Sequence, residues 1–371
     1  AADAACKFFT YEGPGANGLC RHKGTDGPDY PRQNASCTSG FPRSTAFAPP
    51  VPANVTVAVG KTRRSEMGAN FVCWNIDASE NRGFFWRNLS AAAPYGAQLA
   101  RQAAALSRAT EAGYSLLRFG GTGNDYLTYA FGGTACPPYT ETTACMNETH
   151  WRSLLSFTEA SRAKMIFGLS YNTGKDWDLG ARYGGGDGGY PFPWDPRNAR
   201  AILQWTIDEG LDHLLAGFEL GNEQNSKYTG KQQAESFKVL YDLTVELWPD
   251  AAKRPPLYGP DPHSYHSASS DGAEWIADWL DSCAELGVPV HAATHHEYIG
   301  IDQTPGGFTS PGKLDINGKI AAMVNRTVRE HSAGFPDIAV FGGEIGPHNG
   351  GAPPCGPGSM RWAGFGDSLW Y

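Results

Sequence analysis

Short apolar runs alternate with longer amphipathic stretches from about residue 54 to the end of the chain. The apolar runs predict buried strands, and stretches with apolar residues three and four positions apart predict helices. We expect strands at 70–77, 114–121, 163–171, 215–222, 255–261, 290–298 and 338–346. Helices are expected between most of them, for example over 97–113, 197–210, 232–248 and 273–287.

About seven repeats of strand and helix predict an α/β fold with a parallel sheet, which right-handed crossovers would close into a (β/α)8 barrel of the TIM type. We assign this barrel to residues 54–371. The sequence after the seventh strand suffices for one helix, so we expect the eighth strand to be absent from this chain. A second chain or a further segment would then complete the barrel. A doubly wound open sheet is the structural alternative, although no G-x-G-x-x-G follows the first strand.

Residues 1–53 are rich in Gly, Pro, Ser and Cys without a sustained period, which predicts an irregular extension. The first residues lack the basic start and apolar core of a signal peptide, so we expect any leader to have been removed already.

Composition narrows the class of protein. Apolar residues make up 41% of the chain and charged residues 18%, which predicts a globular protein with a sizeable core. No apolar run is long enough for a membrane span. The formal net charge of −8 argues against a surface that binds nucleic acid.

The eight cysteines are even in number and contain no C-x-x-C pair, which argues against a cysteine-bound metal. We predict a loop disulfide between Cys136 and Cys145, and some pairing among Cys6, Cys20 and Cys37. Five N-x-S/T sequons, together with the cysteines, favour an oxidising, glycosylating compartment, so we expect a secreted or lysosomal protein. The sequons are at Asn34, Asn54, Asn88, Asn147 and Asn325.

Two glutamates end predicted strands, where the loops of such a barrel carry its catalytic groups. Glu223 follows the fourth strand and Glu344 ends the seventh. Retaining glycoside hydrolysis needs two carboxyl groups about 5–5.5 Å apart, one to protonate the leaving oxygen and one to attack the anomeric carbon. We therefore predict Glu223 as the acid/base and Glu344 as the nucleophile.

Neighbouring polar residues fit the same chemistry. Asn222 could bind the sugar 2-hydroxyl. His296 and Tyr298 could donate hydrogen bonds to the carboxylate of Glu344. Glu219 lies inside the fourth strand, and we expect it to be a buried partner of the catalytic groups.

Other interpretations of these residues remain open. Taken singly, a strand-end glutamate is more often a cap or an ion-pair partner. His295, His296 and Glu297 could form a metal site, but alternation along a strand sends neighbours to opposite faces. We expect no metal and no cofactor.

Seven stretches resemble glycoside hydrolase family 79, the heparanase and β-glucuronidase family of retaining barrels. In order along the chain they are NIDAS (75–79), LRFGGTGND (117–125), IFGLSYNTG (166–174), FELGNEQNS (218–226), LYGPDP (257–262), HHEY (295–298) and FGGEIGPHNGGAP (341–353). The motifs LGNE and GGE are typical of the wider clan, whereas RFGGT and LYGPD are more specific.

The resemblance implies the same roles for Glu223 and Glu344. It also implies sugar contacts by Asp77, Thr122, Asn222 and Tyr298, and a uronate carboxylate held by the backbone amides of Gly350 and Gly351. The loop after Glu344 is about one residue shorter than in the animal enzyme, and Asn349 stands where a glycine is usual. The C-terminal β-sandwich of the family is expected to be absent.

We therefore expect a retaining hydrolase acting on glucuronic-acid-containing glycans. The acidic composition makes an enzyme for sulfated heparan chains less favoured. The alternatives are a clan relative with another sugar specificity and a non-catalytic carbohydrate-binding relative on the same barrel.

Overall fold

The chain divides into two compact units, and the larger one, 67–297 with 316–345, contains the predicted strands and most of the helices. The computed structural model describes residues 9–12, 19–22, 73–77, 89–92, 94–108, 112–133, 135–136, 145–171, 192–263, 271–298 and 311–346.

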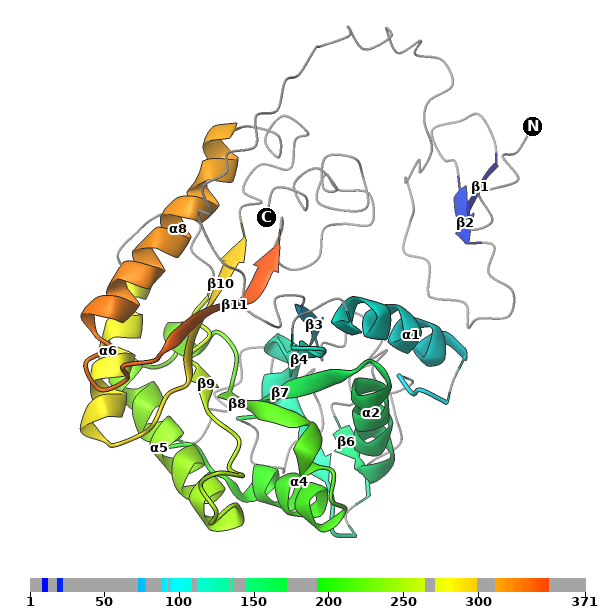
Figure 1. Ribbon diagram of the computed structural model, residues 1–371, viewed down its shortest axis with the longest axis horizontal. Coiled ribbons are helices and arrows are strands. Elements are labelled where there is room, and N and C mark those ends of the chain that lie inside the picture. Colours follow the sequence, from blue (N-terminus) through cyan, green and yellow to red (C-terminus); the bar gives the residue numbers. More distant parts are fainter. Residues whose placement is uncertain are drawn as a thin grey trace, which may run out of the picture. The chain divides into compact units, whose positions relative to one another are not determined.

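All seven predicted strands are present within the predicted segments (Figure 1). They are β3 (Cys73–Asp77), β4 (Ser115–Gly120), β7 (Ala163–Leu169), β8 (Leu215–Leu220), β9 (Tyr258–Gly259), β10 (Ala292–Tyr298) and β11 (Ala339–Gly346).

The strands lie side by side in the order of the sequence. One sheet has the order β3-β4-β7-β8 with parallel pairing, and the other has the order β9-β10-β11. A parallel bridge between Phe218 and Leu257 links β8 to the strand segment at β9, and the Phe218 N–H donates to the Pro256 carbonyl at 2.9 Å. Sequential neighbours joined by helices are typical of βαβ units.

The parallel α/β arrangement is thus confirmed, whereas closure of the barrel is not seen. Among the described residues β3 and β11 do not pair. The expected absence of an eighth strand concerns residues after 346, which lie outside the described part of the chain.

The described helices connect successive strands, and Figure 1 shows α2, α4, α5 and α6 along the outer side of the sheets. Their bounds are α1 (Pro94–Arg108), α2 (Glu148–Ala160), α4 (Arg197–Asp208), α5 (Gly230–Leu247), α6 (Asp271–Glu285) and α8 (Pro311–Glu330). Three short 3-10 helices are η3 (Thr122–Tyr126), η4 (Asp212–Leu214) and η5 (Gln224–Ser226). Among the described helices, none is long and apolar enough to cross a membrane.

A capping box starts α5 shortly after the loop that carries Glu223. The Thr229 hydroxyl accepts from the Gln232 N–H at 3.1 Å, and the Gln232 side chain accepts from the Thr229 N–H at 3.0 Å. These bonds satisfy backbone donors that a helix start leaves open, so the sequence itself fixes where this loop ends.

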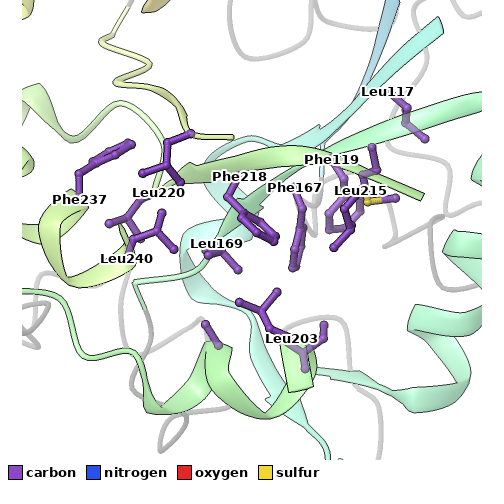
Figure 2. Packing of buried hydrophobic residues seen from close by; sticks show 14 of the residues in the cluster. Leu117, Phe119, Phe167, Leu169, Leu203, Leu215, Phe218, Leu220, Phe237 and Leu240 are labelled. Atoms are coloured by element: carbon purple, nitrogen blue, oxygen red, sulfur yellow. The ribbon is translucent and has the colours of Figure 1, made fainter. Parts of the chain in front are cut away.

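The central strands β4, β7 and β8 are largely buried on both faces, and alternation decides what each face contacts. In β4 all six residues are buried. Leu117 and Phe119 point toward the helices, where Phe167 and Leu203 pack in the same cluster (Figure 2). Arg118 lies between them and therefore points to the opposite, inner face of the sheet. A charged residue on an inner face requires buried partners.

Two short pairs of strands lie outside this pattern. β5 (Thr128–Ala130) pairs in parallel with β6 (Cys145–Asn147). β1 (Phe9–Glu12) and β2 (Leu19–His22) form an antiparallel pair within the extension that we predicted to be irregular. Each of these two strands has only four residues, which is too short for a clear alternation of apolar and polar residues.

The predicted disulfide is confirmed. Cys136 and Cys145 are bonded, with their Cα atoms 5.8 Å apart. The pairing expected among Cys6, Cys20 and Cys37 concerns side chains outside the described residues.

Glycosylation stays a prediction. Of the five sequon asparagines, Asn34, Asn54 and Asn88 lie outside the described residues. Asn147 caps α2, where its side chain accepts from the His150 N–H at 3.0 Å. Asn325 is exposed on α8.

Removal of the disulfide is expected to lower stability. The bond closes a loop with a sequence separation of 9. Chain entropy for such a loop gives roughly 2–3 kcal/mol, so the double variant Cys136→Ala with Cys145→Ala should unfold at a lower urea concentration. A reductant should lower the stability of the wild type and leave that of the double variant unchanged. Equal stability of the two oxidised proteins would contradict this prediction.

Candidate active site

The candidate residues gather at the carboxyl ends of the strands. Arg118, Glu219 and His296 lie in the second halves of β4, β8 and β10. A cavity of about 590 Å³ opens at the opposite, amino-terminal ends of the same strands, and none of the candidate residues lines it. In parallel α/β barrels chemistry is located at the carboxyl ends, which agrees with the position of this cluster.

The two predicted glutamates face each other. One carboxylate oxygen of each glutamate and a ring nitrogen of His296 all lie within 4.8 Å of one another. The glutamate side chains are 15% and 13% exposed, so a substrate can reach both while most of each is shielded. Gly343 precedes Glu344 at a crowded point, since a Cβ there would overlap the Asp261 carboxylate.

Arg118 is the buried centre of the cluster, with 6% of its side chain exposed. Its Nε donates to Glu219 Oε2 at 2.7 Å, and one terminal nitrogen donates to Glu344 Oε1 at 2.8 Å. The other terminal nitrogen donates to Asn222 Oδ1 at 3.1 Å and to Asp261 Oδ2 at 3.4 Å. Burial alone would lower the pKa of Arg118, but the negative charges of the surrounding carboxylates raise it well above its ordinary value. A planar guanidinium can hold several carboxylates in fixed orientations at once.

His296 is the second cation of the cluster and is fully buried. Its Nδ1 lies 3.0 Å from Glu223 Oε1, and its Nε2 lies 3.2 Å from Asp261 Oδ1. Burial alone would lower the pKa of His296, but the charge of Glu344 and the two hydrogen bonds raise it to about 10. The ring is therefore protonated at neutral pH, and both nitrogens donate.

The position of His296 differs in one respect from our expectation. We predicted that it would donate to Glu344, but its Nδ1 is 3.9 Å from that carboxylate, an ion-pair distance, and is hydrogen bonded to Glu223 instead. The reason is that β10 carries His296 between Glu223 and Asp261, while Arg118 already occupies Glu344 Oε1.

Two further carboxyls complete the buried charges. Burial raises the pKa of Glu219 to about 8, opposed by Arg118 and helped by the charge of Asp261. For Asp261 burial alone would raise the pKa, but Arg118 and His296 hold it well below its ordinary value. Glu219 and Asp261 are hydrogen bonded, and the opposite directions of their pKa shifts favour Glu219 as the partner that carries a shared proton. The expectation that Glu219 is a buried partner is confirmed.

Three residues of the cluster could also offer ligand atoms to a metal ion, since such atoms of Glu223, His296 and Glu344 lie within 4.8 Å of one another. In the structure these residues are hydrogen bonded instead, His296 to Glu223 and Asp261, and Glu344 to Arg118. His295 and Glu297 point to the other face of β10, where their side chains lie 3.5 Å apart. The alternation that argued against a metal site of His295, His296 and Glu297 is thus observed.

The other predicted substrate contacts have different positions. Asn222 is buried, and its Nδ2 donates to the exposed Thr122 hydroxyl at 3.3 Å, so these two lie beside Glu223. Tyr298 is the last residue of β10 and is half-buried. Asp77 ends β3, but its side chain lies outside the described residues, as do Gly350 and Gly351. Their sugar contacts stay predictions.

Sequence reasoning missed two members of the cluster, Arg118 and Asp261. Both were visible as motif residues, in LLRFGG and LYGPD, but neither was given a role. An arginine in the middle of an apolar strand is itself a signal, because buried cations need carboxylate partners. Asp261 carried no such signal, since a Pro-Asp pair after a strand is an ordinary turn sequence.

Comparisons with known proteins identify the family of the chain. The model of glycosyl hydrolase family 79, N-terminal domain, matches residues 53–351. The chain belongs to this family. Heparanase-like protein 1 from Arabidopsis thaliana is 27% identical over 69% of this chain and 46% of its own length. Heparanase-like protein 3 from the same plant is 22% identical over 63% and 44%.

The family 79 chain thus spans less than half the length of these two relatives. Among solved structures, a glucosidase from Croceicoccus marinus aligns with a TM-score of 0.37 and 15% identity, covering 61% of this chain and 43% of the other. The expectation of a family 79 glycoside hydrolase is confirmed at the level of the family.

Proposed function

We propose that this chain carries the catalytic residues of a retaining β-glycosidase that hydrolyses glucuronides. The observation that carries the proposal is the short distance between the two glutamates. One carboxylate oxygen of Glu223 lies within 4.8 Å of one carboxylate oxygen of Glu344, in a partly open site. That separation suits direct attack by one carboxylate on a sugar that the other protonates, whereas inversion needs roughly 6.5–9.5 Å to admit a water.

The reaction follows from the two carboxyls. Glu344 attacks the anomeric carbon, the bond to the leaving oxygen breaks, and the proton of Glu223 passes to that oxygen. Water then attacks the same carbon, its proton returns to Glu223, and the bond to Glu344 breaks. Two inversions at one carbon give retention.

The surrounding charges support this division of roles. Arg118 donates to Glu344 and keeps an oxygen of that carboxylate in a fixed direction. The reaction requires a proton on Glu223 and an ionised Glu344 before the first step.

The glucuronide specificity rests on the family and on the names of its heparanase-like relatives. We expect the backbone amides of Gly350 and Gly351 to bind the uronate carboxylate, as the resemblance implies. Export from the cell, in keeping with the confirmed disulfide, belongs to the same proposal.

Turnover of a panel of para-nitrophenyl β-glycosides tests the proposal. The kcat/KM for the β-glucuronide should be at least about 100-fold higher than the values for the β-glucoside, β-galactoside and β-xyloside. A neutral sugar leaves the hydrogen-bond donors for the uronate carboxylate without a partner. Proton NMR of the first product should show the β anomer.

The three alternatives give other results. Preference for a neutral sugar would favour a clan relative with another specificity. An α product would contradict the double displacement. Turnover of none of the glycosides would favour the non-catalytic relative.

A further inference from the structure

A further buried carboxyl, Asp125, lies directly behind the turn that carries Glu223. It belongs to η3, follows the RFGG segment, and has 1% of its surface exposed. The Gln224 amide nitrogen donates to Asp125 Oδ2 at 2.6 Å and to the Asn222 carbonyl at 2.8 Å. The Asn222 N–H also donates to this carboxyl. Asp125 thus contacts the residues on both sides of Glu223 and does not line the reacting site itself.

The turn at Glu223 needs such support. Glu223 has φ 52° and ψ 42°, a left-handed conformation that is unfavourable for a non-glycine residue and persists only where the surroundings hold it. From one side the Glu223 N–H donates to the Asp261 carbonyl at 3.0 Å. Gln224 and Asp125 hold the backbone on the other side of the turn. Arg118 and His296 bond instead to the side chains of Asn222 and Glu223.

The segment that carries Asp125 is itself anchored. The Ser170 hydroxyl donates to the Asp125 carbonyl at 2.9 Å, and Ser170 follows directly on β7. The backbone of Asp125 is therefore fixed to the end of β7. Through the bond between Gln224 and the Asp125 carboxyl, the Glu223 turn is connected to that strand.

We propose that Asp125 is a positioning residue for acid/base catalysis, which through Gln224 and the Asn222 backbone holds Glu223 over the leaving oxygen. The proposal rests on the proposed function, since it assigns a purpose to the turn only if Glu223 transfers a proton. Asp125 touches neither sugar nor reacting atoms. Its effect is confined to where the carboxyl of Glu223 lies.

The charge state of Asp125 agrees with this arrangement. Burial raises the pKa of Asp125 to about 8, opposed by Lys227 and by the bonds from Asn222 and Gln224, so the carboxyl is neutral at pH 7. Its Oδ1 is buried and accepts no hydrogen bond, as are Asn124 Oδ1 and Gln224 Oε1. Asparagine, which also pairs one acceptor with one donor group, should therefore replace Asp125.

The leaving group gives a test that a general loss of structure would not pass. A good leaving group departs without a proton, whereas a poor one needs the acid. The kcat/KM of a retaining glycosidase reports the first step, in which the acid acts. We therefore compare Asp125→Ala, Asp125→Asn and the wild type on para-nitrophenyl and phenyl β-glucuronide.

Asp125→Ala should lower kcat/KM for the phenyl glycoside by about 10- to 100-fold, because a displaced acid transfers its proton poorly. The loss for the para-nitrophenyl glycoside should stay below about threefold. Asp125→Asn should retain both activities within about threefold, since it keeps the acceptor for Gln224.

Gln224→Met removes both bonds from the other partner and keeps the volume of the side chain. It should show the same leaving-group dependence, and Asp125→Ala combined with Gln224→Met should cost no more than either alone, because the two act as one unit. This second variant keeps the test decisive if Asp125→Ala fails to fold.

Thr206→Val serves as the matched control. Thr206 is a fully buried residue on α4 whose hydroxyl accepts from the Trp151 indole at 2.8 Å, remote from the Glu223 turn. It should lower the melting temperature without any leaving-group dependence. If Asp125→Ala and Gln224→Met lose kcat/KM equally on the two substrates, or lose none, the inference is overturned. Turnover by the wild type would still uphold the proposed function in that case. An inactive wild type would overturn the proposed function itself.

Discussion

Glu344→Ala should lower kcat for para-nitrophenyl β-glucuronide by about four to six orders of magnitude, the loss expected when a covalent nucleophile is removed from a site that works as a unit. Glu223→Ala should lose less on this activated substrate in the first step and should accumulate the glycosyl-enzyme, because the second step needs the base. The two carboxyls are thus predicted to differ in kind, although they lie within 4.8 Å of each other.

Azide distinguishes the two roles by stereochemistry. In Glu223→Ala the anion can attack the glycosyl-enzyme from the face where water normally enters, which gives a β-glycosyl azide. In Glu344→Ala it can enter the space of the missing carboxylate, which gives an α-glycosyl azide. The products are identified by NMR after incubation of each variant with substrate and azide.

Glu285→Gln provides the control for this pair. Glu285 is exposed at the end of α6, so loss of its charge should leave kcat unchanged. Exchange of the two azide anomers between the variants would reverse the assignment of acid/base and nucleophile. Full activity of Glu344→Ala would exclude Glu344 from the chemistry.

The arrangement of the strands could be predicted from sequence because central strands such as β4, β7 and β8 are largely buried on both faces and are rich in apolar residues. The positions of Glu223 and Glu344 at strand ends followed from the same pattern. Their mutual distance did not, because a pattern along the chain contains no information on how strands curve. The contact between Arg118 and Glu344 joins residues 226 positions apart.

The details of the acid/base turn were equally hidden. A left-handed conformation is signalled by glycine or asparagine, and Glu223 is neither. What makes the turn tolerable is a set of buried partners on other elements, among them Asp125 and Asp261. Such partners are found only when side chains from several strands are placed together.

Arg118→Met should destabilise the protein by about 3–5 kcal/mol, which is the range for removing one partner from a buried ion pair. The variant leaves His296 as the cation beside Asp261 and Glu344 and removes the bond to Glu219, while Met fills much of the same volume. Urea unfolding followed by circular dichroism measures the loss. Arg152→Met is the matched control, since Arg152 pairs with Glu209 at the surface, where both side chains are well exposed. That pair should contribute at most about 1 kcal/mol.

The loss in Arg118→Met should also depend on pH, and its sign follows from Asp261. Arg118 helps to hold the pKa of Asp261 well below its ordinary value, a contribution to stability that is present above the unfolded pKa and is lost as pH falls through the folded one. Without the arginine this contribution is reduced, and protonation of the carboxyls relieves the uncompensated charge. An ordinary aspartate has a pKa of about 3.9. The difference from wild type should therefore be largest near pH 7 and shrink as the pH falls below about 4. A difference as small as that of Arg152→Met, or one constant with pH, would mean that Arg118 does not hold these carboxylates together, and Glu344 would then lack the fixed orientation that nucleophilic attack requires.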